Sequence, residues 1–72
     1  MKQASKKAVA LGIKLAKESA TQVVVGWNLF SSLRCPASAW LPERGTKFSR
    51  EALKEFRVGL LIMPDGETHP LM

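Results

Sequence analysis

Residues 6–20 read KKAVALGIKLAKESA, and at helical spacing this stretch separates into two faces. One face carries small side chains at every fourth position, and such a row forms a groove into which another element packs closely. Glycine inside a helix costs about 1 kcal/mol relative to alanine, so a central glycine favours a close contact there. We therefore expect a helix over residues 4–20 that packs through a small-residue row, which consists of Ala4, Ala8, Gly12, Ala16 and Ala20.

The opposite side of this helix carries four lysines, which we call the lysine face: Lys6, Lys7, Lys14 and Lys17. Packing of the small-residue row places these side chains in solvent whether or not they bind anything. Two main interpretations therefore remain open. The lysines form either a solvated surface or a basic ridge that binds phosphates or an anionic patch. Binding to a membrane surface is a third interpretation, and the apolar face, rich in Ala and Gly, disfavours it.

Two apolar stretches predict the strands at the centre of a sheet. Residues 21–30 read TQVVVGWNLF, and consecutive valines are typical of a buried strand. This strand runs either to Phe30 or only to Gly26, with a helical turn over residues 27–33 in the second case. Gly26 itself indicates a bulge or a close approach of the helix. Residues 58–63, VGLLIM, predict another central strand.

The C-terminal half of the sequence is divided by turn signals. In residues 38–48, a proline followed by a glycine predicts a hairpin. Ser49 is suited to cap a short helix that ends at Phe56. Residues 64–66, Pro-Asp-Gly, predict a turn, and any strand that follows is limited to a sheet edge by Pro70.

This order of elements predicts an α+β fold in one small domain that spans residues 1–72. We expect the N-terminal amphipathic helix to pack on one face of a three- or four-stranded sheet, antiparallel or mixed, with a second short helix near residues 50–56. The expected elements are a basic helix at 1–20, a strand at 21–30, a hairpin at 38–48, a short helix at 49–56, and a strand, turn and tail at 57–72.

Charge and cysteine content indicate the class of protein. The 72 residues carry a formal net charge of +5, which raises the rate of encounter with phosphates and acidic proteins. Cys35 is the only cysteine, which excludes an internal disulfide and favours an intracellular, cytoplasmic protein. No stretch reaches the roughly twenty apolar residues that cross a bilayer, so we expect no membrane partner.

No combination of residues in the sequence predicts catalysis. Cys35 and His69 are each the only residue of their kind, and neither has partners at the spacing of a metal site or a catalytic set. The glycines are isolated from one another, so no phosphate-binding loop is present. A chain of this size also leaves little room for a substrate pocket. We therefore expect a protein that is not an enzyme and has no catalytic residue, cofactor or metal ion.

The strongest functional candidate is the segment 34–57, in which basic and aromatic residues are interleaved. Its basic side chains would bind phosphates, and an exposed Trp40 would stack on a base. The alternative is that Trp40 and Phe48 face inward as core residues. Together with the lysine face, this segment predicts a small regulatory protein that binds nucleic acid or a nucleoprotein complex. Its candidate contacts are Arg34, Trp40, Arg44, Lys47, Arg50, Lys54 and Arg57.

A protein-binding role is the alternative function: an inhibitor, an adaptor or a small subunit of a larger assembly. Apolar strand edges and aromatic side chains would then contact the partner. The small-residue row would also allow a homodimer. The candidate interface residues are Leu11, Gly12, Leu15, Trp27 and Trp40.

Overall fold

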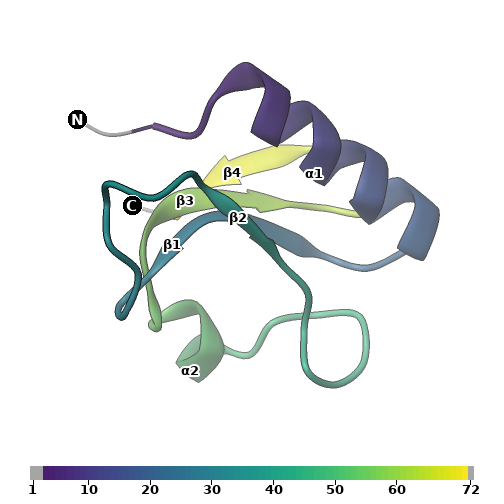
Figure 1. The fold of residues 1–72 in the computed structure, drawn as a ribbon. Coiled ribbons are helices and arrows are strands. Elements are labelled where there is room, and N and C mark those ends of the chain that lie inside the picture. The colour runs from purple at the N-terminus through teal and green to yellow at the C-terminus, as the bar shows by residue number, and fades with distance from the viewer. Residues whose placement is uncertain (1–2, 72) are drawn as a thin grey trace.

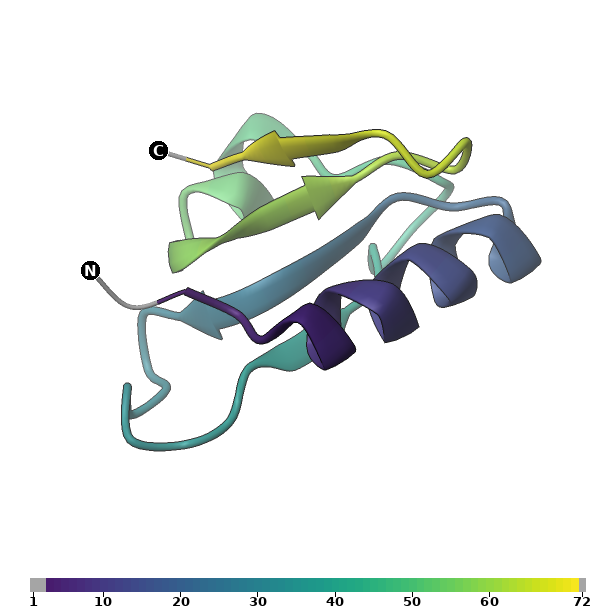
Figure 2. The ribbon, with the colours of Figure 1, turned by 90° about the horizontal axis from the view of Figure 1, so that it is seen from above.

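The strands of the computed structural model form one antiparallel sheet in the order β2-β1-β3-β4, and α1 and α2 lie on opposite sides of it (Figures 1 and 2). The structure describes residues 3–71. Its elements are α1 (Lys6–Ser19), β1 (Val23–Asn28), β2 (Ser38–Trp40), α2 (Arg50–Leu53), β3 (Phe56–Ile62) and β4 (Thr68–Pro70). The predicted α+β fold, with a helix on a sheet and a second short helix, is confirmed.

α1 begins and ends at residues that form hydrogen bonds with the backbone groups left unpaired at the helix termini. The Oγ atom of Ser5 accepts a hydrogen bond from the N–H of Ala8 at 3.1 Å, which caps the first turn. Ala20 ends the helix in the left-handed conformation with a φ of 54°, and its N–H donates to the carbonyl of Ala16. α1 is therefore slightly shorter than the predicted 4–20. No helix within residues 3–71 combines the length and the apolar character that crossing a lipid bilayer requires.

The small-residue row packs on the sheet through Ala4, Ala8, Gly12 and Ala16, as predicted, whereas Ala20 is exposed at the end of the helix. A Cβ atom on Gly12 would overlap the side chain of Val25 and lie 2.8 Å from Cδ1 of Ile62, so glycine allows this close approach. Ala16 is buried beside it and forms the core cluster with Val23, Val25 and Ile62, each at most 1% exposed. The core of the molecule thus lies between α1 and the two inner strands.

β1 continues through Gly26 to Asn28, so neither predicted end of this strand, at Gly26 or at Phe30, is correct. The close approach at Gly26 is to β3 and not to the helix, because this residue pairs with Gly59 and an added Cβ would lie 2.6 Å from the Cα of Gly59. A bulge follows directly, with Arg57 of β3 as the extra residue. The two glycines let the inner strands of the sheet come together.

The hairpin predicted at residues 38–48 is wrong. β2 pairs with β1 instead, and the segment 46–48 belongs to no strand. Gln22, immediately before β1, holds this segment: its N–H donates to the carbonyl of Thr46 at 2.9 Å, and its Oε1 accepts from the N–H of Phe48 at 2.9 Å. Hydrogen bonds with Gln22, which is distant in sequence, therefore hold residues 46–48, and these residues do not pair with β2 as the turn residues predict.

α2 is shorter than the helix predicted at 49–56. Ser49 caps it as expected, with Oγ accepting from the N–H of Ala52 at 3.1 Å. The helix ends at Leu53 because Phe56 pairs with β1 and opens β3. Pairing in the sheet thus prevents the predicted last turn of the helix from forming.

The C-terminal segment follows the prediction. Asp65 Oδ1 accepts from the N–H of Glu67 at 2.9 Å, and Gly66 has a φ of 95°, which a glycine adopts without strain. β4 then pairs with β3 at the edge of the sheet, where Pro70 stands opposite Leu60. Since proline has no N–H, this edge position is the one that the sequence allows.

Candidate functional site

The lysine face lies on the solvent side of α1, and all four of its side chains are exposed, as predicted. Glu18 is the only acidic residue of the helix. Within residues 3–71, the one ion pair joins Nε2 of His69 to Oε1 of Glu67 at 3.1 Å. No lysine of the face is therefore neutralised by an ion pair in the described part of the chain. Their role in binding nucleic acid stays a prediction.

The two ends of α1 differ in how well they accommodate a lysine. Lys17 lies in the last turn, where the helix dipole favours a positive charge. Lys6 and Lys7 lie in the first turn, which contains no acidic residue. A cation at that end is disfavoured by about 0.3 to 1 kcal/mol. The first turn is thus electrostatically unfavourable unless an anion approaches it.

The other basic residues predicted to bind nucleic acid are also exposed, but most of them lie away from the lysine face. The loop of residues 41–49 and α2 lie on the side of the sheet opposite α1 (Figure 1). Arg57 is the bulged residue of β3, and Arg34 lies in the loop between β1 and β2. The structure therefore divides the predicted contacts into the lysine face and an opposite group, which consists of Arg44, Lys47, Arg50 and Lys54.

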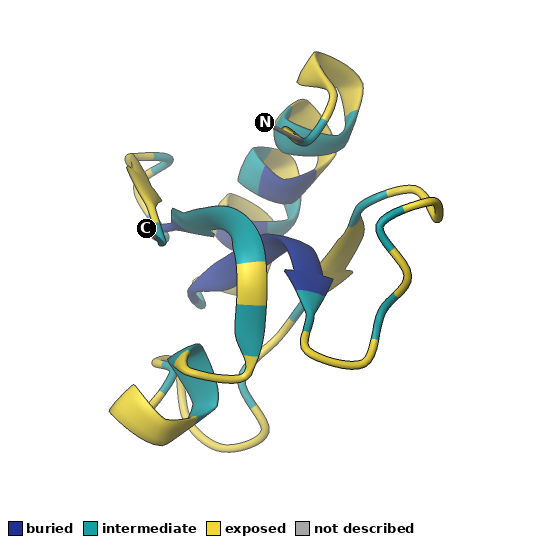
Figure 3. Ribbon diagram, turned by 90° about the vertical axis from the view of Figure 1, so that its left-hand side faces the viewer, coloured by how far each residue is buried: buried dark blue, intermediate teal, exposed yellow. Residues whose placement is uncertain are grey.

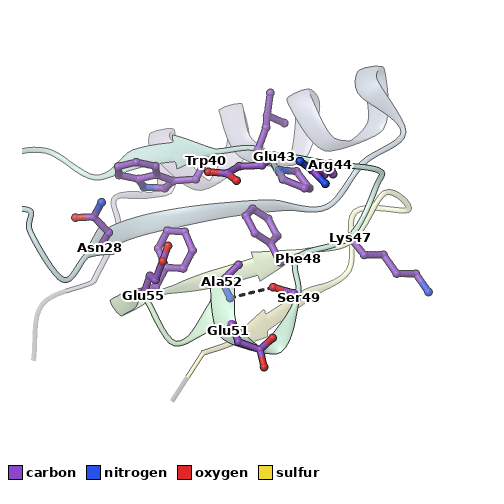
Figure 4. Close-up of a pocket in the computed structure, with 13 residues that line it drawn as sticks. Asn28, Trp40, Glu43, Arg44, Lys47, Phe48, Ser49, Glu51, Ala52 and Glu55 are labelled. Carbon is purple, nitrogen blue, oxygen red and sulfur yellow. Dashed lines mark hydrogen bonds between the residues drawn. The ribbon is translucent and has the colours of Figure 1, made fainter.

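On that opposite side, the loop and α2 enclose a pocket of about 530 Å³ (Figure 4). Three aromatic rings form its apolar part. The ring of Phe56 lies 5.7 Å from that of Trp40 and 5.9 Å from that of Phe48, with edge-to-face angles of 70° and 88°. The expectation that this chain leaves little room for a pocket is therefore not met, because a half-open hollow of this volume lies between the loop, α2 and the sheet.

The charged residues of the pocket carry both signs. They are Glu43, Glu51 and Glu55, with Arg44 and Lys47. A polyanion would meet more carboxylates than cations there, so this lining is poorly suited to phosphates. Trp40 also lines the pocket, and its Nε1 is buried without a hydrogen-bond partner in residues 3–71.

The residues predicted to contact a protein partner are divided between the interior and the surface. Trp27 is 2% exposed and donates from Nε1 to the carbonyl of Cys35 at 2.8 Å. Gly12 is buried where α1 meets the sheet, Leu15 is half-buried against the core, and Trp40 is half-buried at the pocket, whereas Leu11 is 60% exposed. The small-residue row is occupied by the chain's own sheet and is not free to receive a second copy.

Phe30, which no sequence pattern marked as a contact residue, is the most exposed large apolar side chain in residues 3–71. It is 90% exposed, and its neighbour Leu29 is 53% exposed, in the loop that follows β1. Asn28 Oδ1 accepts from the N–H of Phe30 at 2.9 Å and from Oγ of Ser31 at 2.8 Å. An asparagine at a strand end, followed by serine, is the signal that predicts such a turn.

Residues that commonly bind metal ions are dispersed in this fold. Within residues 3–71, no three His, Cys, Asp or Glu side chains come together as a metal site would require. Cys35 is a free and exposed thiol in the loop between β1 and β2. Comparison with protein-family models, curated proteins and solved structures found no match for this chain.

Proposed function

We propose that this chain is a small, non-enzymatic regulatory protein that binds nucleic acid or a nucleoprotein complex through the lysine face of α1. The observation that carries the proposal is the exposure of these four lysines on one side of a helix whose other side is packed on the sheet. None of them is paired with an acidic side chain in the described part of the chain. Their charge is therefore available to phosphates.

The lysine face is long enough to contact several phosphates. α1 has 14 residues, which corresponds to a length of about 21 Å. Each phosphate neutralised on a single strand contributes about −0.7 to the slope of log affinity against log salt concentration. Contacts by all four lysines therefore predict a slope of about −3.

The first turn of α1 supports the same proposal. Lys6 and Lys7 lie where the helix dipole disfavours positive charge. A bound phosphate would neutralise these lysines and would itself be attracted by the free N–H groups of the first turn. Stability of the helix therefore gives no reason for two lysines at this end, whereas binding of a polyanion does.

The proposal is tested by measuring the affinity for single-stranded DNA and RNA oligonucleotides at several salt concentrations. K6Q/K7Q and K14Q/K17Q each remove two charges from the lysine face, and glutamine keeps the helix propensity of lysine. We expect each variant to reduce the magnitude of the salt slope by about 1.4. R44Q/K47Q removes the same charge from the opposite side of the sheet and should leave the slope unchanged.

A second measurement separates binding from folding. Because K6Q/K7Q removes positive charge from the first turn of α1, it should stabilise the fold by about 0.5 kcal/mol while it weakens binding. Thermal unfolding followed by circular dichroism measures this change. Equal losses of affinity in K6Q/K7Q and R44Q/K47Q would contradict the lysine face as the site. Absence of any salt-dependent binding by the unmodified chain would contradict the proposed function.

A protein-binding role is the second candidate function, and the pocket opposite α1 favours it. The aromatic rings of Trp40, Phe48 and Phe56 suit an apolar side chain of a peptide. This site is independent of the lysine face because the sheet lies between them.

The indole N–H resonances of the two tryptophans test this second role in one NMR titration with a pool of short peptides rich in aromatic and aliphatic residues. Trp27 donates to Cys35 inside the chain and serves as the internal control. We expect the Nε1–H signal of Trp40 to move and that of Trp27 to stay. A titration in which neither signal moves, or both move together, would contradict a peptide site at the pocket.

A further inference from the structure

Phe30 is placed in solvent although the chain has few large apolar side chains to bury. Only three phenylalanines are present, and Phe48 and Phe56 pack against each other at the pocket. Phe30 is instead 90% exposed, next to Leu29 at 53%. Because burial of such a side chain favours folding, a nearly free phenylalanine marks a surface at which something else covers it.

The loop that carries Phe30 is held at both of its ends. At the first end, Asn28 Oδ1 accepts from the N–H of Phe30 at 2.9 Å, and the N–H of Leu29 donates to the carbonyl of Glu55 at 2.7 Å. At the second end, Nε1 of the buried Trp27 donates to the carbonyl of Cys35 at 2.8 Å. The backbone under Phe30 is thus ordered before anything binds, which lowers the entropy cost of a contact there.

This loop lies at the same end of the molecule as the start of the lysine face. β1 runs antiparallel to α1, so β1 ends, and the loop after it starts, at the end of the molecule where α1 begins (Figure 2), although the end of β1 lies well below the helix in Figure 1. Ala4 and Ala37, from the two segments, pack against the same core cluster. Residues 29–37 contain Arg34, which is exposed, and no acidic residue. An exposed aromatic ring therefore shares its loop with the positive charge of Arg34, and Lys6 and Lys7 lie at the same end of the molecule.

We infer that Phe30 stacks on an unpaired base of a single-stranded nucleic acid, while Arg34 and the first lysines of the lysine face contact the flanking phosphates. This inference rests on the proposed function and specifies its ligand. A ring can stack on a base only where the base is free of its duplex partner, so the chain selects single strands over duplexes of the same length. Trp40, which the sequence suggested for this role, lies at the pocket on the other side of the sheet.

The experiment compares the unmodified chain with Phe30→Ala and Phe30→Trp, using a labelled single-stranded oligonucleotide and the duplex made from it. We expect Phe30→Ala to weaken single-strand binding about tenfold and to leave duplex binding and the salt slope unchanged, since no phosphate contact is lost. Phe30→Trp should retain affinity. Its emission at long wavelength, distinct from that of the buried Trp27 and half-buried Trp40, should be quenched by the single strand.

Leu41→Ala is the matched control, because it removes another apolar side chain that is 50% exposed but lies at the pocket. It should leave both affinities unchanged. If the lysine variants weaken binding and Phe30→Ala does not, the stacking inference is wrong and the proposed function stands. Equal weakening of single-strand and duplex binding by Phe30→Ala would also overturn it. So would a Phe30→Trp signal that responds to anionic phospholipid vesicles and not to the oligonucleotide, which would assign the loop to a lipid surface.

Discussion

α1 covers one face of the sheet along its length, whereas the opposite face is covered only by the four-residue α2 and the loop before it (Figure 3). On the α1 side, Val25 and Ile62 are at most 1% exposed. On the opposite side, Val24 is also fully buried, but Trp40, Phe48 and Phe56 remain half-buried around a pocket. The comparison teaches that close packing on one face supplies the stability of the fold, and that incomplete packing on the other leaves space for a ligand.

The largest effect is expected from a side chain forced into the packed face. Gly12→Leu would place its first carbon against Val25 and Ile62, where no space exists. We expect a loss of at least about 4 kcal/mol, because overpacking on this scale is among the most damaging of core changes. A domain of 72 residues is typically stable by only about 4 to 11 kcal/mol, so urea unfolding should show a chain that is barely folded.

Ala10→Leu is the control for this variant. It introduces the same side chain on the exposed side of the same helix. Its stability should stay within about 0.5 kcal/mol of that of the unmodified chain. Similar losses of stability in the two variants would show that leucine destabilises the helix wherever it is placed, and that close packing under Gly12 is not the cause.

A medium effect is expected from removing one large side chain from each face. Ile62→Ala should cost about 3 kcal/mol, because it empties a fully buried site on the α1 side. Phe48→Ala should cost only about 1 to 2 kcal/mol, although more atoms are lost, because that ring is half-buried and borders an existing pocket. Denaturant midpoints measure both. A larger loss of stability in Phe48→Ala than in Ile62→Ala would show that the pocket side contributes more to stability than the exposure of its side chains suggests.

The smallest effect is expected at the contact that closes the pocket loop onto the sheet. Gln22→Ala removes the acceptor for the N–H of Phe48 and should cost only about 1 kcal/mol. Amide hydrogen exchange should accelerate at Phe48 more than within β1 or β3. Thr21→Ala, one position earlier, lies outside this contact and should leave Phe48 protected. Uniform acceleration across the sheet in Gln22→Ala would contradict a local role for this residue.

Features that depend on neighbouring residues could be predicted from the sequence. Spacing of small residues around Gly12 predicts the packed side of α1 and, with it, the exposure of the lysine face. Ser49 predicts the start of α2 because a cap contacts residues only a few positions away. Pro70 predicts an edge strand because the missing N–H is a property of the residue itself.

Features that depend on distant partners could not be predicted in this way. The turn residues of 38–48 indicate a hairpin, but Gln22 and β1 supply the actual partners of this segment. Phe56 continues a helical pattern, yet its pairing with Asn28 places it in a strand. The pocket is formed by residues from positions 28 to 56, so it exists only after these pairings are made. The outward turn at Phe30 could not be predicted for a different reason. Asn28 lies within the mostly apolar residues 23–30, which indicate a continuing strand and not the turn that the side chain of Asn28 stabilises.

The strand order described above also determines how the chain is protected from amyloid-like assembly. The most apolar and β-branched segments, Val23–Val25 and Leu60–Ile62, are of the type that forms cross-β fibrils when exposed. Both lie in inner strands, whose backbone groups are paired on two sides. The outer strands are three residues each, and one of them contains Pro70, so each offers little template to another molecule. Two very short strands thus separate the most apolar segments of this chain from those of neighbouring molecules.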